Sequence, residues 1–453
     1  MNSCFFLLFI FTAVTFLRCL TSTEAATCHP DDEAGLLAFK AGITRDPSGI
    51  LSSWKKGTDC CPWNGITCLP GGRVTRLLVE GSSVIAGSIF TGTISPSLAK
   101  LQHLTDVRFG NLQIIGSFPQ FLFQLPNLKA VYIRNTSLSG PLPVNIGGLS
   151  RLEYLILDGN QFTGPIPSSL SSLTNLYQLS LANNRFSGTI PNMFKSMTKL
   201  QYILLTNNKF SGELPPSIAS LARTLLWLQV GQNNLSGTIP DYLSRCKVLS
   251  TLYLFRNRFS GVVPKSLARL TKLTDLDLSH NLLTGPFPFL KVKDMRSLDL
   301  SYNKFQLKEI PKWVTSSELM YSLKLAKCGI KMRLDDWKAV SIFGYSYIDL
   351  SENEITGSPA RLLNQANQLF AFKASGNKLR FNMGELRFDK SLGILDLSRN
   401  LVFGKVPTGV DTLEELNLSH NHLCGKLPTT KFPASAFAGN DCLCGSPLSP
   451  CKF

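Results

Sequence analysis

The sequence predicts an α/β solenoid, a right-handed superhelix in which every coil adds one strand to a parallel concave sheet. Two observations lead to this prediction: a motif that recurs every 21 to 25 residues, and cysteines that gather near both ends of the 453-residue chain. Residues 152–167, LEYLILDGNQFTGPIP, are a clean copy of the motif. Twelve successive copies carry an Asn, once replaced by Cys, at their centre: Asn160, Asn184, Asn208, Asn233, Asn257, Asn281, Asn303, Cys328, Asn353, Asn377, Asn400 and Asn421.

Each position of the motif LxxLxLxxNxLxGxIP has a physical role. The leucines of LxL alternate with polar residues, so a short strand turns its apolar side inward and its other side chains toward solvent. The Asn amide offers donors and an acceptor, which we expect to satisfy backbone groups of its own coil and the next. The Gly permits a tight backbone, and the Pro ends the pairing. This motif and its period are typical of leucine-rich repeats.

Less regular copies precede the clear ones. Two begin at Leu104 and Leu128, with Leu112 and Thr136 in the Asn position, and a looser one begins at Val74. The sequence therefore predicts about fifteen coils over residues 71–428. Because one coil cannot bury its core alone, the array needs a cap at each end.

The segments outside the repeats differ in composition. Residues 5–17 are almost wholly apolar and are followed by Arg18 and small residues up to Ala25, which is typical of a secretory signal peptide over residues 1–25. A membrane anchor is the alternative, but about 13 apolar residues are too few to span a bilayer. Residues 26–70 and 429–453 are predicted to form an N-terminal and a C-terminal cysteine cap, with Cys424 contributing to the second. No later apolar run could span a membrane, and we expect a secreted protein of the extracellular space or cell wall.

The cysteines indicate an oxidising compartment. Eight of them lie near the two ends of the mature chain: Cys28, Cys60, Cys61, Cys68, Cys424, Cys442, Cys444 and Cys451. This placement predicts two disulfides in each cap. Zinc binding by Cys442 and Cys444 is the alternative, which secretion disfavours. Cys246 and Cys328 fall at core positions of the motif and are expected to be buried free thiols.

Three Asn-x-Ser sequons, at Asn135, Asn234 and Asn417, are expected glycosylation sites of a secreted chain. Asn135 and Asn417 fall on or beside the strand face, where a glycan would cover part of that surface.

The chain is basic, with 46 Lys and Arg against 30 Asp and Glu and a formal net charge of +16. Such a surface favours polyanionic partners. Nucleic acid is not expected, because the chain is secreted and has no compact basic motif. Weak binding to an acidic wall polysaccharide such as pectin is one interpretation of the charge, and simple solubility is the alternative.

The strand positions that face solvent are free to carry function. From the second coil to the seventh they hold an aromatic band with basic edges, and also the aliphatic Ile156 and Leu204. Tyr, Trp and Arg dominate binding energy at protein interfaces, which predicts a protein-binding site; the alternative is that aromatic residues simply suit strands. The predicted partner-binding residues are Lys129, Tyr132, Arg134, Tyr154, Tyr177, Gln178, Tyr202, Trp227, Gln229, Tyr253, Phe255 and Arg256.

Within this band, the spacing of Tyr154, Tyr177, Tyr202 and Trp227 predicts matching strand positions about one coil apart, so we expect a continuous ridge across neighbouring strands. The later coils instead read LDLS, with a repeated acidic position at Asp277, Asp299, Asp349 and Asp396.

Enzymatic chemistry is not predicted. His280 and His420 lie in SHN copies of the motif with no recurring partner, and GxSxG, HExxH, P-loop and GxGxxG motifs do not occur. The series His420-x-His422-x-Cys424 could suggest a metal, but the repeat accounts for His420 and the cap for Cys424. We expect no cofactor, no metal and no catalytic residue.

Both ends of the chain resemble those of known plant proteins. DDEAGLLAFKAGI reads as a short amphipathic helix, and WxxGxxCCPWNGITC, with Trp54 and Trp63, resembles the N-terminal cap of plant leucine-rich-repeat receptors and secreted proteins. LSHNHLCGKLP and FAGNDCLCGSPLSPC resemble the C-terminus of polygalacturonase-inhibiting proteins. The resemblance implies the disulfides Cys28–Cys60, Cys61–Cys68, Cys424–Cys442 and Cys444–Cys451.

This resemblance also implies a function. The family binds and inhibits fungal or insect polygalacturonases in the cell wall through exposed residues of the strand face, as part of defence. The alternative is a soluble receptor-like module that binds a peptide or a membrane receptor in signalling or development. Wall anchoring or ice binding is a third class, and the bulky aromatic band argues against ice binding.

Overall fold

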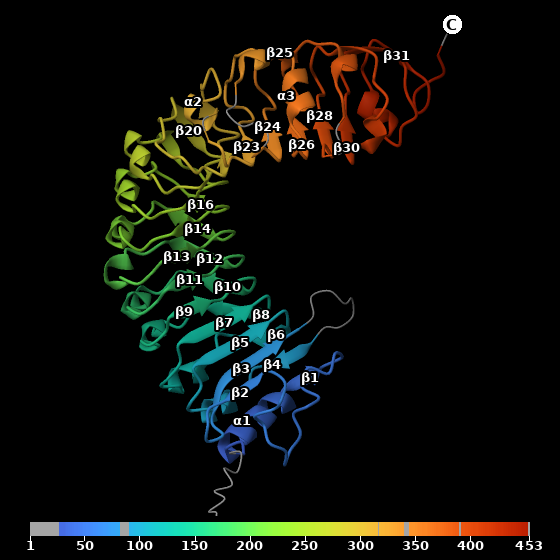
Figure 1. Cartoon of the computed structure of the whole chain (residues 1–453). Helices are drawn as coiled ribbons and strands as arrows, with labels where there is room; N and C mark the ends of the chain where they lie inside the picture. The colour runs from blue at the N-terminus through green and yellow to red at the C-terminus, as the bar shows by residue number, and fades with distance from the viewer. Residues whose placement is uncertain (1–26, 82–89, 316, 339–343, 389–390, 452–453) are drawn as a thin grey trace, which may run out of the picture.

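The computed structural model describes residues 27–81, 90–315, 317–338, 344–388 and 391–451. The predicted signal peptide lies outside the described residues. The coils stack one on the next into an open arc, from α1 (Pro30–Ala41) at one end to β31 (His422–Lys426) near the other (Figure 1). In the described part of the chain, no helix has the length and apolar character needed to cross a membrane.

The predicted sheet is present, and we term it the inner sheet. It has 16 strands, of which β2 pairs antiparallel with β3 while the other neighbours, from β3 to β30, pair in parallel. Leaving out β2, one strand per coil gives 15 coils, as predicted. The strands are β2 (Ile66–Cys68), β3 (Val74–Glu80), β5 (Asp106–Gly110), β7 (Ala130–Arg134), β9 (Tyr154–Ile156), β11 (Gln178–Ser180), β13 (Tyr202–Leu204), β15 (Trp227–Gln229), β17 (Thr251–Tyr253), β19 (Asp275–Asp277), β21 (Ser297–Asp299), β23 (Ser322–Lys324), β24 (Tyr347–Asp349), β26 (Ala371–Lys373), β28 (Ile394–Asp396) and β30 (Glu415–Asn417).

A second set of short strands lies mostly after the Asn position, where no strand was predicted. We term these the outer strands; they pair mostly in parallel from coil to coil, because the same backbone groups recur beside each other in every coil and need partners. They form sheets of eight, three, two and three strands. The strands are β1 (Ile43–Arg45), β4 (Thr91–Thr93), β6 (Gln113–Gly116), β8 (Ser137–Pro141), β10 (Gln161–Gly164), β12 (Arg185–Thr189), β14 (Lys209–Gly212), β16 (Asn234–Leu235), β18 (Ser260–Val262), β20 (Leu282–Gly285), β22 (Lys304–Phe305), β25 (Thr356–Gly357), β27 (Lys378–Leu379), β29 (Phe403–Gly404), β31 and β32 (Cys442–Cys444).

Short helical turns complete most coils after the Pro of the motif. Several begin directly after a proline, whose missing N–H and fixed φ suit a first helical turn. They are η1 (Pro96–Lys100), η2 (Gln120–Gln124), η3 (Ile146–Gly148), η4 (Ser168–Ser172), η5 (Phe194–Ser196), η6 (Pro216–Leu221), η7 (Asp241–Arg245), η8 (Lys265–Arg269), α2 (Lys312–Thr315), η9 (Leu334–Asp336), α3 (Ala360–Gln365), η11 (Met383–Glu385), η12 (Val410–Thr412) and η13 (Ala434–Phe437).

The Asn side chains form a ladder through the core, but its direction differs from the prediction. In Asn257, Nδ2 donates to the carbonyl oxygens of Leu254, in the same coil, and of Val230, in the preceding coil, at 3.1 and 3.0 Å. Its Oδ1 accepts from the backbone N–H of Leu235, again in the preceding coil, at 2.9 Å. The expectation that each Asn serves the next coil was wrong, because the side chain points back along the array. Cys328 takes the same place, with Sγ 3.4 Å from the carbonyl oxygen of Leu300.

The core is continuous along the whole array. Leucines of the inner sheet are buried, and phenylalanines two residues after the Asn stack from coil to coil. The ring centroids of Phe162, Phe186 and Phe210 lie 6.1 and 6.2 Å apart, with the rings nearly parallel. Each coil therefore depends on its neighbours for burial, as expected for a solenoid.

Both caps are disulfide-bonded, and all four bonds have the pairing that the family resemblance implied: Cys28–Cys60, Cys61–Cys68, Cys424–Cys442 and Cys444–Cys451. The zinc alternative for Cys442 and Cys444 is therefore wrong. Trp54 and Trp63 stack at 5.7 Å and are buried. Cys246 and Cys328 are buried free thiols.

Candidate functional site

Five aromatic side chains on the inner sheet form a chain of contacts, which we term the aromatic ridge. The ring centroids of Tyr132, Tyr154, Tyr177, Tyr202 and Trp227 follow one another at 6.0, 5.6, 5.3 and 5.1 Å. Trp227 is 40% exposed, and the tyrosines are half-buried against one another. The hydroxyl contact with Tyr177, with burial, raises the pKa of Tyr202. The ridge is thus a preformed apolar surface with phenol groups along it.

The strand register corrects one detail of the prediction. Tyr154, Gln178, Tyr202 and Trp227 occupy matching positions on β9, β11, β13 and β15. Tyr177 precedes that position by one residue, so the expectation that all four aromatic residues share one position was wrong. Its ring still bridges Tyr154 and Tyr202, because diagonal neighbours on a sheet remain within reach of aromatic side chains.

Arg108 extends the ridge toward the N-terminus, and sequence reasoning missed it. Its guanidinium carbon lies 4.3 Å from the ring centre of Tyr132. Asp106 holds this guanidinium through two hydrogen bonds of 2.8 Å, which raise the pKa of Arg108. The predicted Lys129 lies beside this end and pairs with Glu153 at 3.4 Å.

The ridge ends near β17. Tyr253 and Phe255 contact each other at 6.3 Å, and burial raises the pKa of Tyr253 to about 12. Phe255 covers Gly231 of the neighbouring coil so closely that a Cβ there would lie 2.3 Å from its ring. Because Gly231 has no side chain, the Phe255 ring can lie close against the backbone of the neighbouring coil. Arg256 follows at an exposed corner with φ of +48°.

All twelve predicted partner-binding residues lie on the inner sheet or its rim, and none is buried. Arg134 is exposed, and Gln178 and Gln229 are half-buried. Ile156 is only 6% exposed, which contradicts the expectation that every such position faces solvent. The apolar side chain instead packs down beside Tyr132, its register partner on β7.

The Asp side chains at the acidic position of the later coils accept hydrogen bonds from backbone N–H groups at the end of their own strands. Oδ1 of Asp277 accepts hydrogen bonds from the backbone N–H and the hydroxyl of Ser279, at 2.9 and 2.6 Å. Asp299 accepts from the N–H of Ser301 at 2.9 Å. Asp349 and Asp396 make the equivalent backbone bond. These carboxylates mainly stabilise the turn toward the Asn ladder.

Burial, and secondarily the Asp277 carboxylate on the neighbouring strand, raise the pKa of Asp299 to about 6 from its ordinary value of 3.8. Because the folded pKa is the higher one, the folded protein binds more protons than the unfolded chain between about pH 4 and pH 6, and stability falls as pH rises through this window. We expect Asp299→Asn to raise the free energy of unfolding at pH 7 by about 1–3 kcal/mol. The advantage should disappear near pH 4.

Denaturant unfolding from pH 4 to 7.5 would measure this effect. Asn417 shows that an amide fits the position, since its Oδ1 accepts from the N–H of Ser419 at 3.1 Å. Asp396→Asn is the matched control, because Lys373 rather than a second carboxylate occupies the preceding strand there. An Asp299→Asn variant whose stability tracked the wild type at every pH would contradict the expectation.

Aromatic residues recur on the inner sheet beyond the acidic strands, where no site was predicted. Tyr321 and Phe370 are 48% and 40% exposed, and Lys324 lies 5.1 Å from the ring centre of the half-buried Tyr347. The same reading of solvent-facing positions, continued past the seventh coil, would have found them. These aromatic residues were overlooked because the LDLS copies before and after them are regular.

The sequons stay predictions. Asn135 and Asn234 are exposed, and Asn417 is half-buried on β30. Nδ2 of Asn135 donates to Oδ1 of Asn111 at 2.9 Å, at the rim beside Arg134. A glycan at Asn135 would therefore stand at the N-terminal end of the aromatic ridge.

The histidines His280 and His422 make contacts with other side chains. His280 stacks on Tyr302 at 4.5 Å, and His422 pairs with Asp441 at 3.1 Å. Cys424 is in a disulfide, so the metal interpretation of its neighbourhood is wrong. The cluster with metal-ligand spacing that the described part of the chain does contain is already tied up in disulfides: Cys60, Cys61 and Cys68.

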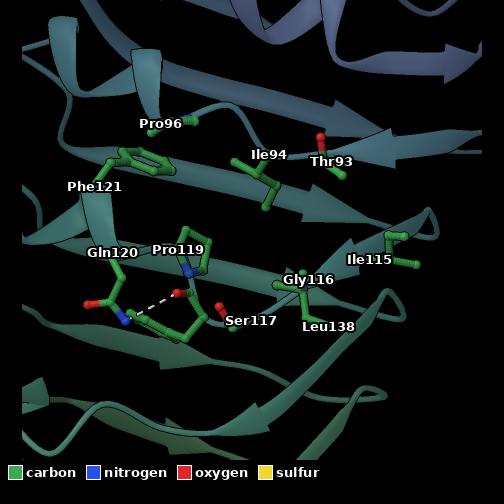
Figure 2. A pocket seen from close by; sticks show the side chains of 11 residues that line it. Thr93, Ile94, Pro96, Ile115, Gly116, Ser117, Pro119, Gln120, Phe121 and Leu138 are labelled. Carbon is green, nitrogen blue, oxygen red and sulfur yellow. Dashed lines mark hydrogen bonds between the residues drawn. The ribbon is translucent and has the colours of Figure 1, made fainter.

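A pocket of about 240 Å³ lies away from the ridge, where outer strands meet the first helical turns (Figure 2). Its apolar lining includes Ile94, Pro96, Pro119 and Phe121, and the Gln120 side chain donates a hydrogen bond to the carbonyl oxygen of Phe118. Its lining contains no ionisable side chain. The pocket lining therefore offers no side chain that could act as a general acid or base.

The repeated sheet, the Asn ladder and the capped ends define a leucine-rich-repeat solenoid. Family models agree: a leucine-rich repeat N-terminal domain matches residues 29–69, and leucine-rich repeat models match residues 223–283, 151–173, 175–197, 199–221 and 412–430.

Curated relatives include plant inhibitors. The chain is 34% identical over 114 residues to polygalacturonase inhibitor 1 of Arabidopsis thaliana, covering 24% of this chain and 34% of the relative. It is 32% identical over 115 residues to polygalacturonase inhibitor 1 of Phaseolus vulgaris, covering 23% and 33%. The matched segments thus span about a third of these relatives.

Solved structures with a similar fold include a receptor. The TDR receptor is 29% identical with a TM-score of 0.58, over 81% of this chain and 72% of the receptor. The chain in the structure of PEPR1–AtPEP1 is 25% identical with a TM-score of 0.56, over 90% and 68%.

Proposed function

We propose that this chain is a secreted recognition protein of the plant cell wall that binds a protein partner on its inner sheet. The observation that carries this proposal is the aromatic ridge, five rings in continuous contact on a face that the core does not use. Trp and Tyr at such positions are the residues that most often anchor protein interfaces. The caps, stabilised by disulfides, suit an oxidising extracellular location.

The first candidate is a polygalacturonase-inhibitor-like protein that acts by occluding an enzyme, without catalysis of its own. Similarity to two plant polygalacturonase inhibitors supports it. The second candidate is a soluble receptor-like module for a peptide or membrane receptor. Fold similarity to the TDR receptor and to PEPR1 supports this alternative.

Enzyme assays separate the two candidates. The mature glycoprotein is incubated with a panel of fungal and insect polygalacturonases, and the release of reducing sugar is measured. An inhibitor must lower the rate of at least one enzyme, and Trp227→Ala must relieve that inhibition. A protein that binds a plant receptor ectodomain through Trp227 and slows none of these enzymes would favour the second candidate.

Weak pectin binding is a further part of the proposal, and a basic surface on the helical side of the coils supports it. Arg245 and Arg269 take equivalent places on η7 and η8 and line one depression with Asp241. Lys247 and Lys272 are exposed just beyond them. With a net charge of +16, this surface suits a polyuronate chain.

We expect the protein to be retained on a pectate column at low salt and released as salt rises, because screening shortens to about 8 Å at physiological ionic strength. The double variant Arg245→Gln/Arg269→Gln should elute at lower salt than the wild type. Lys405→Gln/Lys426→Gln, which removes the same charge near the C-terminal cap, is the control. Retention that did not respond to salt would contradict electrostatic binding.

A further inference from the structure

A second apolar surface lies on the inner sheet, which we term the C-terminal cluster: Tyr321, Tyr347, Phe370 and Ile394. These residues belong to, or immediately precede, four adjacent strands, β23, β24, β26 and β28. Tyr321 and Phe370 are exposed, at 48% and 40%. The core does not account for them.

The position of the Phe370 ring is set by its neighbour. A Cβ at Gly393, on the next strand, would lie 2.4 Å from a ring carbon of Phe370, so the absence of a side chain there lets the ring lie across the sheet. The same arrangement places Phe255 over Gly231 beside the ridge. The half-buried Phe255, beside the ridge, and the exposed Phe370, in the C-terminal cluster, thus each lie against a glycine of an adjacent coil.

The two surfaces follow the same narrow track across the strands. Tyr347 and Ile394 stand at the register position that Tyr202 and Trp227 occupy in the ridge, and Phe370 stands one residue earlier, as Tyr177 does. From β15 to β26 there are six strand steps, which is about 29 Å at roughly 4.8 Å per step. A strip about two residues wide and this long fits an extended segment better than a rounded surface.

The strands between the two surfaces, β19 and β21, carry acidic groups on the same face. Among the described residues, Asp275 and Asp277 have no cation within ion-pair distance, and Lys324 lies 3.9 Å from Asp299. Arg296 is exposed directly before β21, and the positive charges of Lys324 and Arg256 partly offset the rise in the pKa of Asp277. Burial raises the pKa of both Asp277 and Asp299, because it disfavours their charged forms. A cation from a partner would complete this environment.

We propose that the aromatic ridge and the C-terminal cluster bind one extended polypeptide segment that places apolar side chains on both surfaces and a Lys or Arg between them. This inference rests on the proposed binding of a protein partner on the inner sheet. It adds the second contact surface and the chemical pattern of the segment: apolar, cationic, apolar.

A random library of twelve-residue peptides displayed on phage tests the inference without the natural partner. Twelve extended residues reach about 40 Å, which is enough to span both surfaces. The library is selected on the immobilised mature protein, and enriched peptides are then titrated against four variants: Trp227→Ala, Phe370→Ala, Asp277→Asn and Phe403→Ala. Phe403 is the matched control, since it is 42% exposed but lies on the outer strand β29.

We expect enriched peptides to carry a Lys or Arg between two apolar residues. Their affinity should fall at least tenfold with Trp227→Ala, Phe370→Ala and Asp277→Asn, and stay unchanged with Phe403→Ala. Peptides that need Trp227 but bind Phe370→Ala as tightly as wild type would overturn the inference and leave the proposed function intact. Enriched peptides without a central cation, or no peptide that depends on either surface, would overturn it as well.

Discussion

Replacing Trp227 by Ala should weaken partner binding by about 2 kcal/mol or more, a loss of roughly 30-fold in affinity, while secretion and thermal stability stay nearly unchanged. Trp227 is 40% exposed and meets Tyr202 edge-on at 5.1 Å, so its removal opens no core cavity but takes away one end of the ridge. Tyr202→Ala should act in the same direction. Titration of the purified partner by calorimetry, together with a thermal melt of each variant, measures both quantities.

Asp396→Asn is the control for this experiment, because it changes the same inner sheet far from the ridge and keeps an acceptor for Ser398. It should change affinity much less than either aromatic substitution. If Trp227→Ala instead unfolds the protein while the folded fraction keeps full affinity, the ridge is structural and the partner binds elsewhere.

Replacing Asn257 by Ala should destabilise the array by about 3 kcal/mol. The buried N–H of Leu235 loses its acceptor, the Oδ1 of Asn257, because the methyl side chain of Ala cannot accept a hydrogen bond. The carbonyl oxygens of Val230 and Leu254 lose one donor each but keep another, from Asn233 and Asn281. The loss is therefore one orphaned donor and several weakened acceptors, rather than collapse of the whole ladder.

Chemical denaturation of the variant measures this loss. Asn175→Ala is the matched control, since Asn175 bonds near the surface to the carbonyl oxygen of Ser150 at 3.3 Å and water can replace that bond. The control should change stability by no more than about 1 kcal/mol. Equal effects of the two substitutions would show that the buried ladder has no special role.

Much of the fold could be predicted because the motif specifies both the length of each coil and the face that is buried. The position of Asn160 and its eleven successors sets the coil length, and the flanking leucines set which face is buried. The outer strands were missed because segments such as Gln161–Gly164 are short and end in glycine, which locally favours a turn. Their pairing comes from the neighbouring coil, which no local pattern contains.

The candidate site was predictable in composition but not in arrangement. Solvent-facing positions identified the aromatic band, yet spacing along the chain misplaced Tyr177 by one residue, because coil lengths vary. Arg108 was missed because its value to the ridge depends on Asp106, which holds the guanidinium over Tyr132. Contacts of this kind need the register of adjacent strands, which the sequence does not state.

The direction of the Asn ladder makes the two ends of the molecule chemically unlike. In most coils the backbone N–H two residues after the Asn donates to the Asn of the following coil, so the last coil needs an acceptor from outside the repeats. Asn440, outside the repeats, supplies this acceptor. Its Oδ1 accepts from the N–H of Leu423 at 3.0 Å, and its Nδ2 donates to the carbonyl oxygen of Leu418 at 3.0 Å. The C-terminal cap thus ends the series of Asn hydrogen bonds from coil to coil. A protein truncated before Asn440 would leave the N–H of Leu423 without this acceptor, and its exposed last coil would be available for stacking onto another copy.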